Sequence, residues 1–193
     1  MTMQDTFPAM GQAALEYAER GWNVFPAPPG TRKSYKCAKH SNGRNWGATT
    51  DVDEIRSDWT QWPQANVGIV GGPQSGLFVI DADTMEGHGK DGVGTLRGWI
   101  EERCDLPHTI EVDTPSGGWH VYFRYPENMK IQTNSNRLAP GIDIRGDGGM
   151  VLAPPSVKTD GTGYSWRNPP GFFELADCPQ WLLDKIAVAQ RPK

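Results

Sequence analysis

Hydrophobic positions recur along the chain with two different periods, and stretches of each period alternate. A spacing of three and four residues predicts helices over residues 10–20, 51–59, 95–103 and 181–189. Alternation and short apolar runs predict strands over 22–25, 67–70, 77–80, 110–112, 119–123, 142–145, 150–152 and 164–166. Gly76 predicts a turn that pairs 67–70 with 77–80 as a hairpin. This mixed order predicts an α+β fold with a mostly antiparallel sheet.

Two carboxylates stand at the end of the apolar strand predicted over 77–80. Asp81 and Asp83 are separated by one residue, so strand geometry places them on the same face, opposite Phe78 and Ile80. Like charges side by side repel each other, and a hard divalent cation relieves that repulsion. An isolated Asp-x-Asp motif is more often a solvated strand end. Whether Asp81 and Asp83 bind a cation therefore depends on the residues of the neighbouring strands.

Two further strands carry ionisable groups on one face and apolar residues on the other. Period two puts His120 and Arg124 on the face opposite Val121 and Phe123. In residues 142–145 it likewise separates Asp143 and Arg145 from two isoleucines. If the three strands share a sheet, we expect one open face to gather three carboxylates, an imidazole and two guanidinium groups.

Composition and charge limit the possible classes of protein. The 193 residues carry a net charge of -4, which argues against nucleic-acid binding through overall charge alone. The segment from Arg32 to Arg44 nevertheless contains only basic charged residues, and it is either a phosphate-facing tract or a solvated loop. No apolar run reaches the roughly 20 residues of a membrane span, so we expect no membrane partner. Three scattered cysteines suit a reducing cytoplasm.

The gathered groups have the chemistry of phosphoryl or nucleotidyl transfer. Asp81, Asp83 and Asp143 are suited to hold two Mg²⁺ or Mn²⁺ ions. His120 and Arg145, with lysines of the basic segment, would neutralise a triphosphate. The two glycines that precede Trp119 would let backbone N–H groups approach phosphate oxygens. On its own, His120 would more often be a structural histidine of a half-buried strand.

Three motifs in this order resemble the bifunctional DNA primase/polymerase (prim-pol) domain of the archaeo-eukaryotic primase superfamily, found in phage and plasmid replication proteins. They are Val-Ile-Asp-Ala-Asp at 79–83, Thr-Pro-Ser-Gly-Gly-Trp-His at 114–120 and Gly-Ile-Asp-Ile-Arg-Gly-Asp-Gly-Gly at 141–149, followed by Ala-Pro-Pro-Ser at 153–156. The resemblance spans roughly residues 13–186. It implies an RRM-like catalytic sheet packed with a smaller N-terminal α/β module, and we expect residues 1–193 to form one catalytic domain.

The resemblance also implies roles for individual residues. Asp81, Asp83 and Asp143 match the metal-binding acids of the family, and His120 matches the histidine that contacts the phosphates of the incoming nucleotide. We expect nucleotide contacts from six residues: His120, Arg145, Ser116, Gly118, Lys33 and Lys36. The basic segment departs from the Lys-Pro pattern expected there, so which lysine contacts phosphate stays open.

The resemblance further implies partners: a DNA template and primer, dNTP or NTP substrates, and a helicase region or partner, which often follows the domain in this family but is not found within the 193 residues. Two other readings of the acids remain. One is a metal-dependent nuclease or phosphohydrolase, and the other is a non-catalytic DNA-binding replication module. Cys37 and His40 make half of a zinc-ligand pattern, although a plain loop is favoured, and Trp46 is the best candidate for base stacking.

Overall fold

The computed structural model describes residues 7–36, 41–103 and 106–191, and the half zinc pattern of Cys37 and His40 lies outside these ranges. In these residues the chain forms a mixed α+β fold with two antiparallel sheets and five α-helices, as expected. The helices are α1 (Ala9–Glu19), α2 (Val52–Gln61), α3 (Met85–His88), α4 (Gly92–Arg103) and α5 (Gln180–Ala189), and a short 3-10 helix covers Asn45–Gly47.

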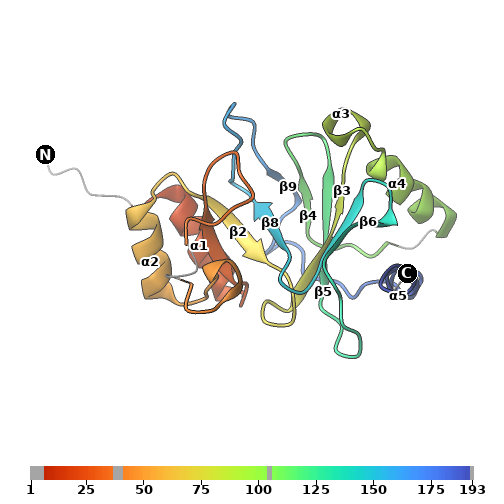
Figure 1. Ribbon diagram of the computed structural model, residues 1–193, viewed down its shortest axis with the longest axis horizontal. Coiled ribbons are helices and arrows are strands. Elements are labelled where there is room, and N and C mark those ends of the chain that lie inside the picture. The colour runs from red at the N-terminus through yellow and green to blue at the C-terminus, as the bar shows by residue number, and fades with distance from the viewer. Residues whose placement is uncertain (1–6, 37–40, 104–105, 192–193) are drawn as a thin grey trace, which may run out of the picture.

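The smaller sheet has the strand order β1-β2-β8 and packs against α1 and α2 (Figure 1). Its strands are β1 (Val24–Ala27), β2 (Asn66–Val70) and β8 (Met150–Ala153). Helix α2 begins as predicted, because the Asp51 carboxylate accepts a hydrogen bond of 2.8 Å from the backbone N–H of Glu54. Since β8 comes from late in the chain, the N-terminal module is completed by a strand that is not N-terminal.

The larger sheet has the order β6-β7-β3-β5-β4-β9, with every pair antiparallel. Its strands are β3 (Leu77–Ala82), β4 (Glu111–Asp113), β5 (Trp119–Arg124), β6 (Asn134–Ala139), β7 (Ile142–Arg145) and β9 (Ser165–Asn168). The sequence pattern did not predict β6, whose residues are largely exposed and lack a clear apolar alternation.

Side chains of β3 alternate between two cores, as period two requires. Phe78 and Ile80 pack with α4 and α5 on the outer face of the large sheet, whereas Leu77 and Val79 pack toward the small sheet and α1. Figure 1 shows the resulting layers, with α1 and α2 at one end, the two sheets between, and α4 and α5 at the other end. The inner face of the large sheet is therefore covered over much of its length, and it is not the fully open face that was expected.

The predicted hairpin between residues 67–70 and 77–80 is wrong. Strand β2 pairs with β1 and β8, and β3 pairs with β5 and β7, so both edges of each strand are occupied by other partners. In the described part of the chain, a single bridge joins Leu77 to Gly72, which follows β2. The glycine-rich segment after β2 carries the chain from one sheet to the other.

No helix among the described residues is long and apolar enough to cross a membrane.

Candidate active site

Three polar residues lie side by side where β7, β3 and β5 meet. Asp81 of β3 is directly opposite His120 of β5 on one side and Asp143 of β7 on the other. This register confirms the prediction that the three strands share a sheet. All three side chains are buried, with residue exposures of 5%, 4% and 7% for Asp81, His120 and Asp143. Buried ionisable groups gathered in this way require charge partners.

Asp81 receives its partners from both neighbouring strands. His120 Nε2 lies 3.3 Å from Asp81 Oδ1, and the Nη2 atom of Arg145 lies 2.9 Å from Asp81 Oδ2. Burial alone would raise the pKa of Asp81, but His120 and then Arg145 outweigh it through their charges and hydrogen bonds. The pKa of this carboxyl is therefore held well below its usual range, and Asp81 is ionised at neutral pH.

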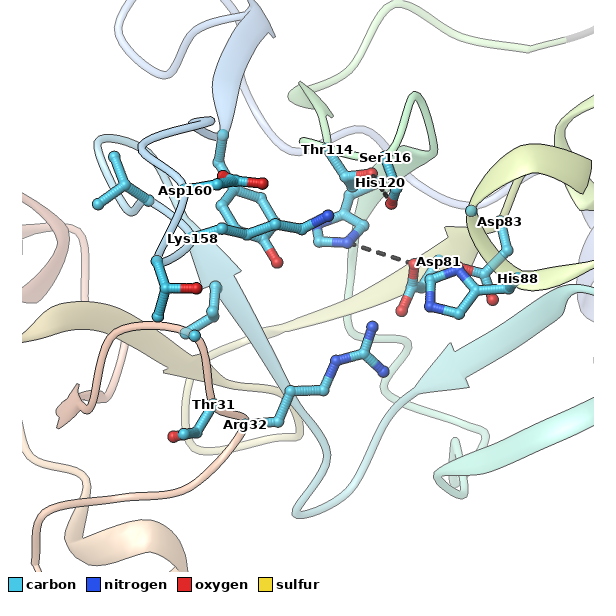
Figure 2. A pocket seen from close by; sticks show the side chains of 16 residues that line it. Thr31, Arg32, Asp81, Asp83, His88, Thr114, Ser116, His120, Lys158 and Asp160 are labelled. Carbon is cyan, nitrogen blue, oxygen red and sulfur yellow. Dashed lines mark hydrogen bonds and ion pairs between the residues drawn. The ribbon is translucent and has the colours of Figure 1, made fainter.

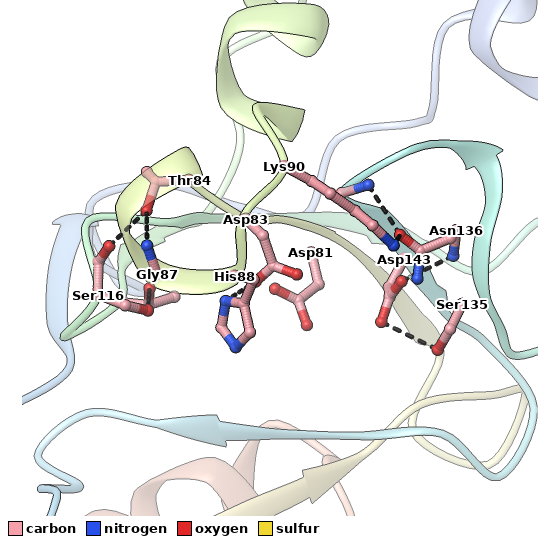
Figure 3. A network of polar contacts seen from close by, with 12 residues as sticks. Asp81, Asp83, Thr84, Gly87, His88, Lys90, Ser116, Ser135, Asn136 and Asp143 are labelled. Atoms are coloured by element: carbon pink, nitrogen blue, oxygen red, sulfur yellow. Dashed lines mark hydrogen bonds and ion pairs between the residues drawn. The ribbon is translucent and has the colours of Figure 1, made fainter.

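Asp143 is held by the neighbouring strand β6 and by Arg145. Its Oδ1 accepts a hydrogen bond of 2.9 Å from the backbone N–H of Asn136, and its Oδ2 accepts one of 3.0 Å from Ser135 Oγ (Figure 3). Arg145 Nη2 also donates to Asp143 Oδ2 at 2.6 Å. One guanidinium group thus bridges Asp81 and Asp143.

Asp83 lies just beyond the end of β3, at the start of the segment that leads to α3. Its backbone N–H donates to the Gly141 carbonyl at 2.8 Å, and its carbonyl accepts from the Val93 N–H at 3.0 Å. His88 Nδ1, on α3, lies 2.9 Å from Asp83 Oδ1 (Figure 3). Burial, followed by the negative charges of Asp81 and Asp143, raises the pKa of Asp83. Burial and the neighbouring carboxylates together therefore disfavour the ionised form of Asp83.

A cleft of about 250 Å³ opens beside Asp81 and Asp83, between the two sheets, and Asp143 is not among the residues that line it. Asp81, Asp83, His88 and His120 form one wall of it, together with Thr114 and Ser116 of the turn between β4 and β5. Figure 2 shows Arg32, from the loop after β1, pointing toward Asp81, and Lys158, from the loop after β8, pointing toward His120. The two loops thus supply cations across the cleft from the acids.

A second hollow of about 170 Å³ adjoins the first, since both are lined by Arg32, Asp81, His120 and Tyr164. Trp46 and Arg145 also line it. Trp46 stacks on Phe25 with ring centroids 5.4 Å apart, and its indole N–H donates to the Gly148 carbonyl at 2.9 Å. The ring is therefore fixed at the edge of the site.

Ser116 is the expected nucleotide contact, besides His120 and Arg145, that the structure places in the site. Arg32, Lys158 and Tyr164 line the cleft but were not among the expected contacts. Arg32 belongs to the basic segment that pointed to phosphate, so composition identified the segment but not the residue. Lys158 carried no signal of its own beyond its position shortly after the Ala-Pro-Pro-Ser motif.

Four other expected contributors lie elsewhere. Lys36 is buried, and its ammonium group forms ion pairs with Glu54 at 2.5 Å and Asp58 at 2.8 Å, so it joins the 31–36 loop to α2. Lys33 is exposed and does not line the cleft. Gly118 is buried against β3, where an added Cβ would meet the Ala82 carbonyl at 2.8 Å. Arg124 lies opposite Leu77, four positions along β3 from Asp81, and bonds to Asp177.

The donor set fits a hard divalent cation. Asp81 and Asp83 offer carboxylate oxygens at the edge of the cleft, and burial together with the charges of Asp81 and Asp143 raises the pKa of Asp83, a cost that a bound cation would offset. Each carboxylate oxygen has two lone pairs, so the contacts of Asp81 to His120 and Arg145 leave room for a further partner. Among the described residues, no group of three His, Cys, Asp or Glu side chains is already arranged as a metal site.

The fold and the site define an α+β domain with a carboxylate-rich cleft between two antiparallel sheets. The family model for the N-terminal bifunctional DNA primase/polymerase domain (Prim-Pol) matches residues 14–181. The chain therefore belongs to this primase/polymerase family. Among proteins with curated descriptions, none matches the sequence.

Proposed function

We propose that the protein is a metal-dependent DNA primase/polymerase that transfers nucleotides from dNTPs, and from NTPs where it starts chains, to a 3′-OH on a DNA template. The observation that carries this proposal is the register of Asp81 with His120 and Asp143 beside a cleft lined by Arg32 and Lys158. Acids on one wall and cations on the other match the two requirements of the reaction, which are metal ligands and triphosphate binding.

In the reaction the 3′-oxygen forms a bond to the α-phosphorus as the bond to pyrophosphate breaks. Asp81 and Asp83 would hold a Mg²⁺ or Mn²⁺ ion, and Asp143 would complete a site for a second one. Ions bound there lower the pKa of the 3′-OH and stabilise charge on the phosphates. Arg32, Lys158 and His120 would bind the triphosphate, with the Ser116 hydroxyl as a further hydrogen-bond partner.

The proposed setting is DNA replication of a phage or plasmid in the host cytoplasm, with a helicase region or partner that opens the template. The protein needs no positive net charge to bind a triphosphate beside the acids, because Arg32 and Lys158 supply positive charge at the cleft itself. The net charge of -4 is therefore compatible with nucleotide binding, and DNA affinity would depend strongly on salt.

Substitution of Asp81 tests the proposal most directly. We expect Asp81→Asn to lower primer extension with Mg²⁺ or Mn²⁺ by at least about 100-fold, because the neutral amide is a far weaker ligand for a hard cation. Gel analysis of a labelled primer-template with dNTPs measures this, and circular dichroism checks the fold. Asp184→Asn, on the exposed side of α5, is the control and should extend primers at the wild-type rate.

The same gel separates the other two readings of the site. Primers shortened by the wild-type protein would indicate a nuclease instead of a polymerase. A wild-type protein that binds DNA but leaves the primer unchanged, with equal binding by the Asp81→Asn variant, would indicate a non-catalytic module. Wild-type extension by Asp81→Asn would show that the metal assignment is wrong.

A further inference from the structure

Arg145 already supplies positive charge between two of the three acids. Its Nη2 lies 2.9 Å from Asp81 Oδ2 and 2.6 Å from Asp143 Oδ2, and its Nε lies 3.2 Å from Asp81 Oδ2. Both carboxylates are buried, so water screens their repulsion poorly. The guanidinium group offsets that repulsion from the place where a cation shared by Asp81 and Asp143 would bind.

We propose that Arg145 is an exchangeable counter-cation of the acid site. In the nucleotide-free protein it closes the Asp81–Asp143 side to metal, and it gives up that place when phosphates draw the guanidinium group away. The proposal rests on the proposed function, because the anion that draws Arg145 away is the triphosphate of the substrate.

The present contacts of Arg145 occupy the Oδ2 atoms of both acids, which a metal ion between Asp81 and Asp143 would need. Asp81 Oδ2 accepts from Arg145 Nε and Nη2, and Asp143 Oδ2 accepts from Arg145 Nη2 and Ser135 Oγ, so both lone pairs of each Oδ2 atom are engaged. A divalent ion placed there would also be repelled by the positive charge beside it. Metal binding at this side therefore requires that Arg145 moves.

The Asp81–Asp83 side differs in this respect. Of the described side chains, the one paired with the Asp83 carboxylate is His88, which lies on the short helix α3 and is 43% exposed. An exposed partner of this kind contributes little and is displaced easily. A first cation can therefore bind to Asp81 and Asp83 while Arg145 stays in place.

Arg145 borders a hollow into which its side chain can move. Its side chain is 16% exposed and lines the smaller hollow together with Arg32 and Trp46, directly beside the main cleft. A guanidinium group binds phosphate oxygens with two parallel hydrogen bonds, which suits it to leave carboxylates for a triphosphate. Exchange of one anion for another keeps Arg145 paired, while the acids receive the metal ion.

A Mn²⁺ titration of the nucleotide-free protein tests the exchange, with free Mn²⁺ followed by electron paramagnetic resonance. We expect the wild-type protein to bind one Mn²⁺ ion tightly, and Arg145→Gln to gain a second site or to bind about tenfold more tightly overall. Arg32→Gln is the matched control, since it removes the same charge from the same smaller hollow but leaves the Arg145 bridge, and it should keep one site.

Substitution of the acids gives a second measurement that holds even if Arg145→Gln fails to fold. In the nucleotide-free protein, Asp83→Asn should weaken Mn²⁺ binding by about tenfold or more, whereas Asp143→Asn should change it by less than about threefold. Equal weakening by the two variants would overturn the proposal, as would a folded Arg145→Gln variant that binds Mn²⁺ like the wild type or like Arg32→Gln.

The titration contains neither DNA nor turnover, so its outcome is independent of polymerase activity. A protein that shows the exchange but extends no primer would contradict the proposed function alone. A protein that extends primers but binds Mn²⁺ at Asp143 without nucleotide would contradict only the exchange.

Discussion

The folded protein disfavours the ionised form of Asp83. Burial and the negative charges of Asp81 and Asp143 raise its pKa, so folding penalises its ionised form. A penalty of this kind is present above the folded-state pKa and absent at pH values below the pKa of about 3.9 that the unfolded chain has. The ionised carboxylate therefore lowers the stability of the folded protein, which is typical of a functional group.

We therefore expect Asp83→Asn to stabilise the protein at pH 7 by about 1 kcal/mol, the usual gain from one stabilising substitution. The gain should shrink as the pH falls and vanish below about pH 4, where the carboxyl of the wild type is protonated. Thermal unfolding at pH 7 and pH 3.5, without divalent ions, measures both effects. A lower melting temperature at pH 7 would show that the ion pair with His88 outweighs the repulsion.

The residues of the site divide into those that strand periodicity could predict and those that it could not. Asp81, His120 and Asp143 lie on strands, where alternation fixes the face of a side chain, and their shared face was predicted correctly. Arg32 and Lys158 lie on loops, whose direction depends on tertiary packing. The prediction that Arg124 belongs to the site was wrong, because alternation gives the face on which a residue lies but not its distance along the strand from the site.

At the scale of elements, helix α4 is fitted closely against the turn between β6 and β7. A Cβ added to Gly92 would lie 2.0 Å from the carbonyl oxygen of Gly141. The same carbonyl accepts the Asp83 N–H, and the helix residue Val93 donates to the Asp83 carbonyl. The start of α4 thereby fixes the backbone of a candidate metal ligand.

Gly92→Ala should accordingly destabilise the protein by about 2 kcal/mol, because the added methyl group must displace backbone. It should also weaken Mn²⁺ binding, because Asp83 moves with that turn. Gly98→Ala is the matched control in the same helix, where an added Cβ meets nothing within 4 Å. This control should stabilise the helix by about 0.5–1 kcal/mol, and urea denaturation of both variants measures the difference. Equal effects of the two substitutions would contradict the close fit.

The positions of elements with strong periodicity were predicted well, but the pairing of β2 with β3 was predicted wrongly. Helices α1, α2 and α5 lie close to their predicted positions, and α4 begins three residues earlier than expected. The hairpin of β2 and β3 was wrong because a short glycine-rich connection suits a crossing between sheets as well as a tight turn. The local sequence does not show that both edges of β2 and of β3 are paired with other strands.

At the scale of the whole molecule, the two sheets are joined by an aromatic cluster between them. Tyr17 of α1 stacks with Trp22, and Trp22 stacks with Tyr122 of β5 at a centroid distance of 6.1 Å. Trp166 of β9 contacts both tyrosines. The N-terminal helix, the small sheet and the large sheet thus share one core, so the cleft lies between two modules that are held together.

The two tyrosines of this core differ in what their hydroxyl groups contact. The Tyr17 hydroxyl donates to the Pro154 carbonyl at 2.5 Å and so joins α1 to the segment after β8. The Tyr122 hydroxyl is fully buried and has no hydrogen-bond partner among the described residues. A buried hydroxyl without a partner destabilises the folded state, whereas a bonded one contributes to it.

The same substitution should therefore have opposite effects at the two positions. Tyr122→Phe should raise the free energy of unfolding by about 1 kcal/mol, because it removes an unpaired polar group and keeps the ring. Tyr17→Phe should lower it by a similar amount, about 1 kcal/mol, because the Pro154 carbonyl loses its donor inside the protein. Urea denaturation followed by tryptophan fluorescence measures both, since Trp22 and Trp166 report directly on this core. Destabilisation by Tyr122→Phe would reveal a partner for its hydroxyl, and the joint between the modules would then contain a polar contact beneath the candidate active site.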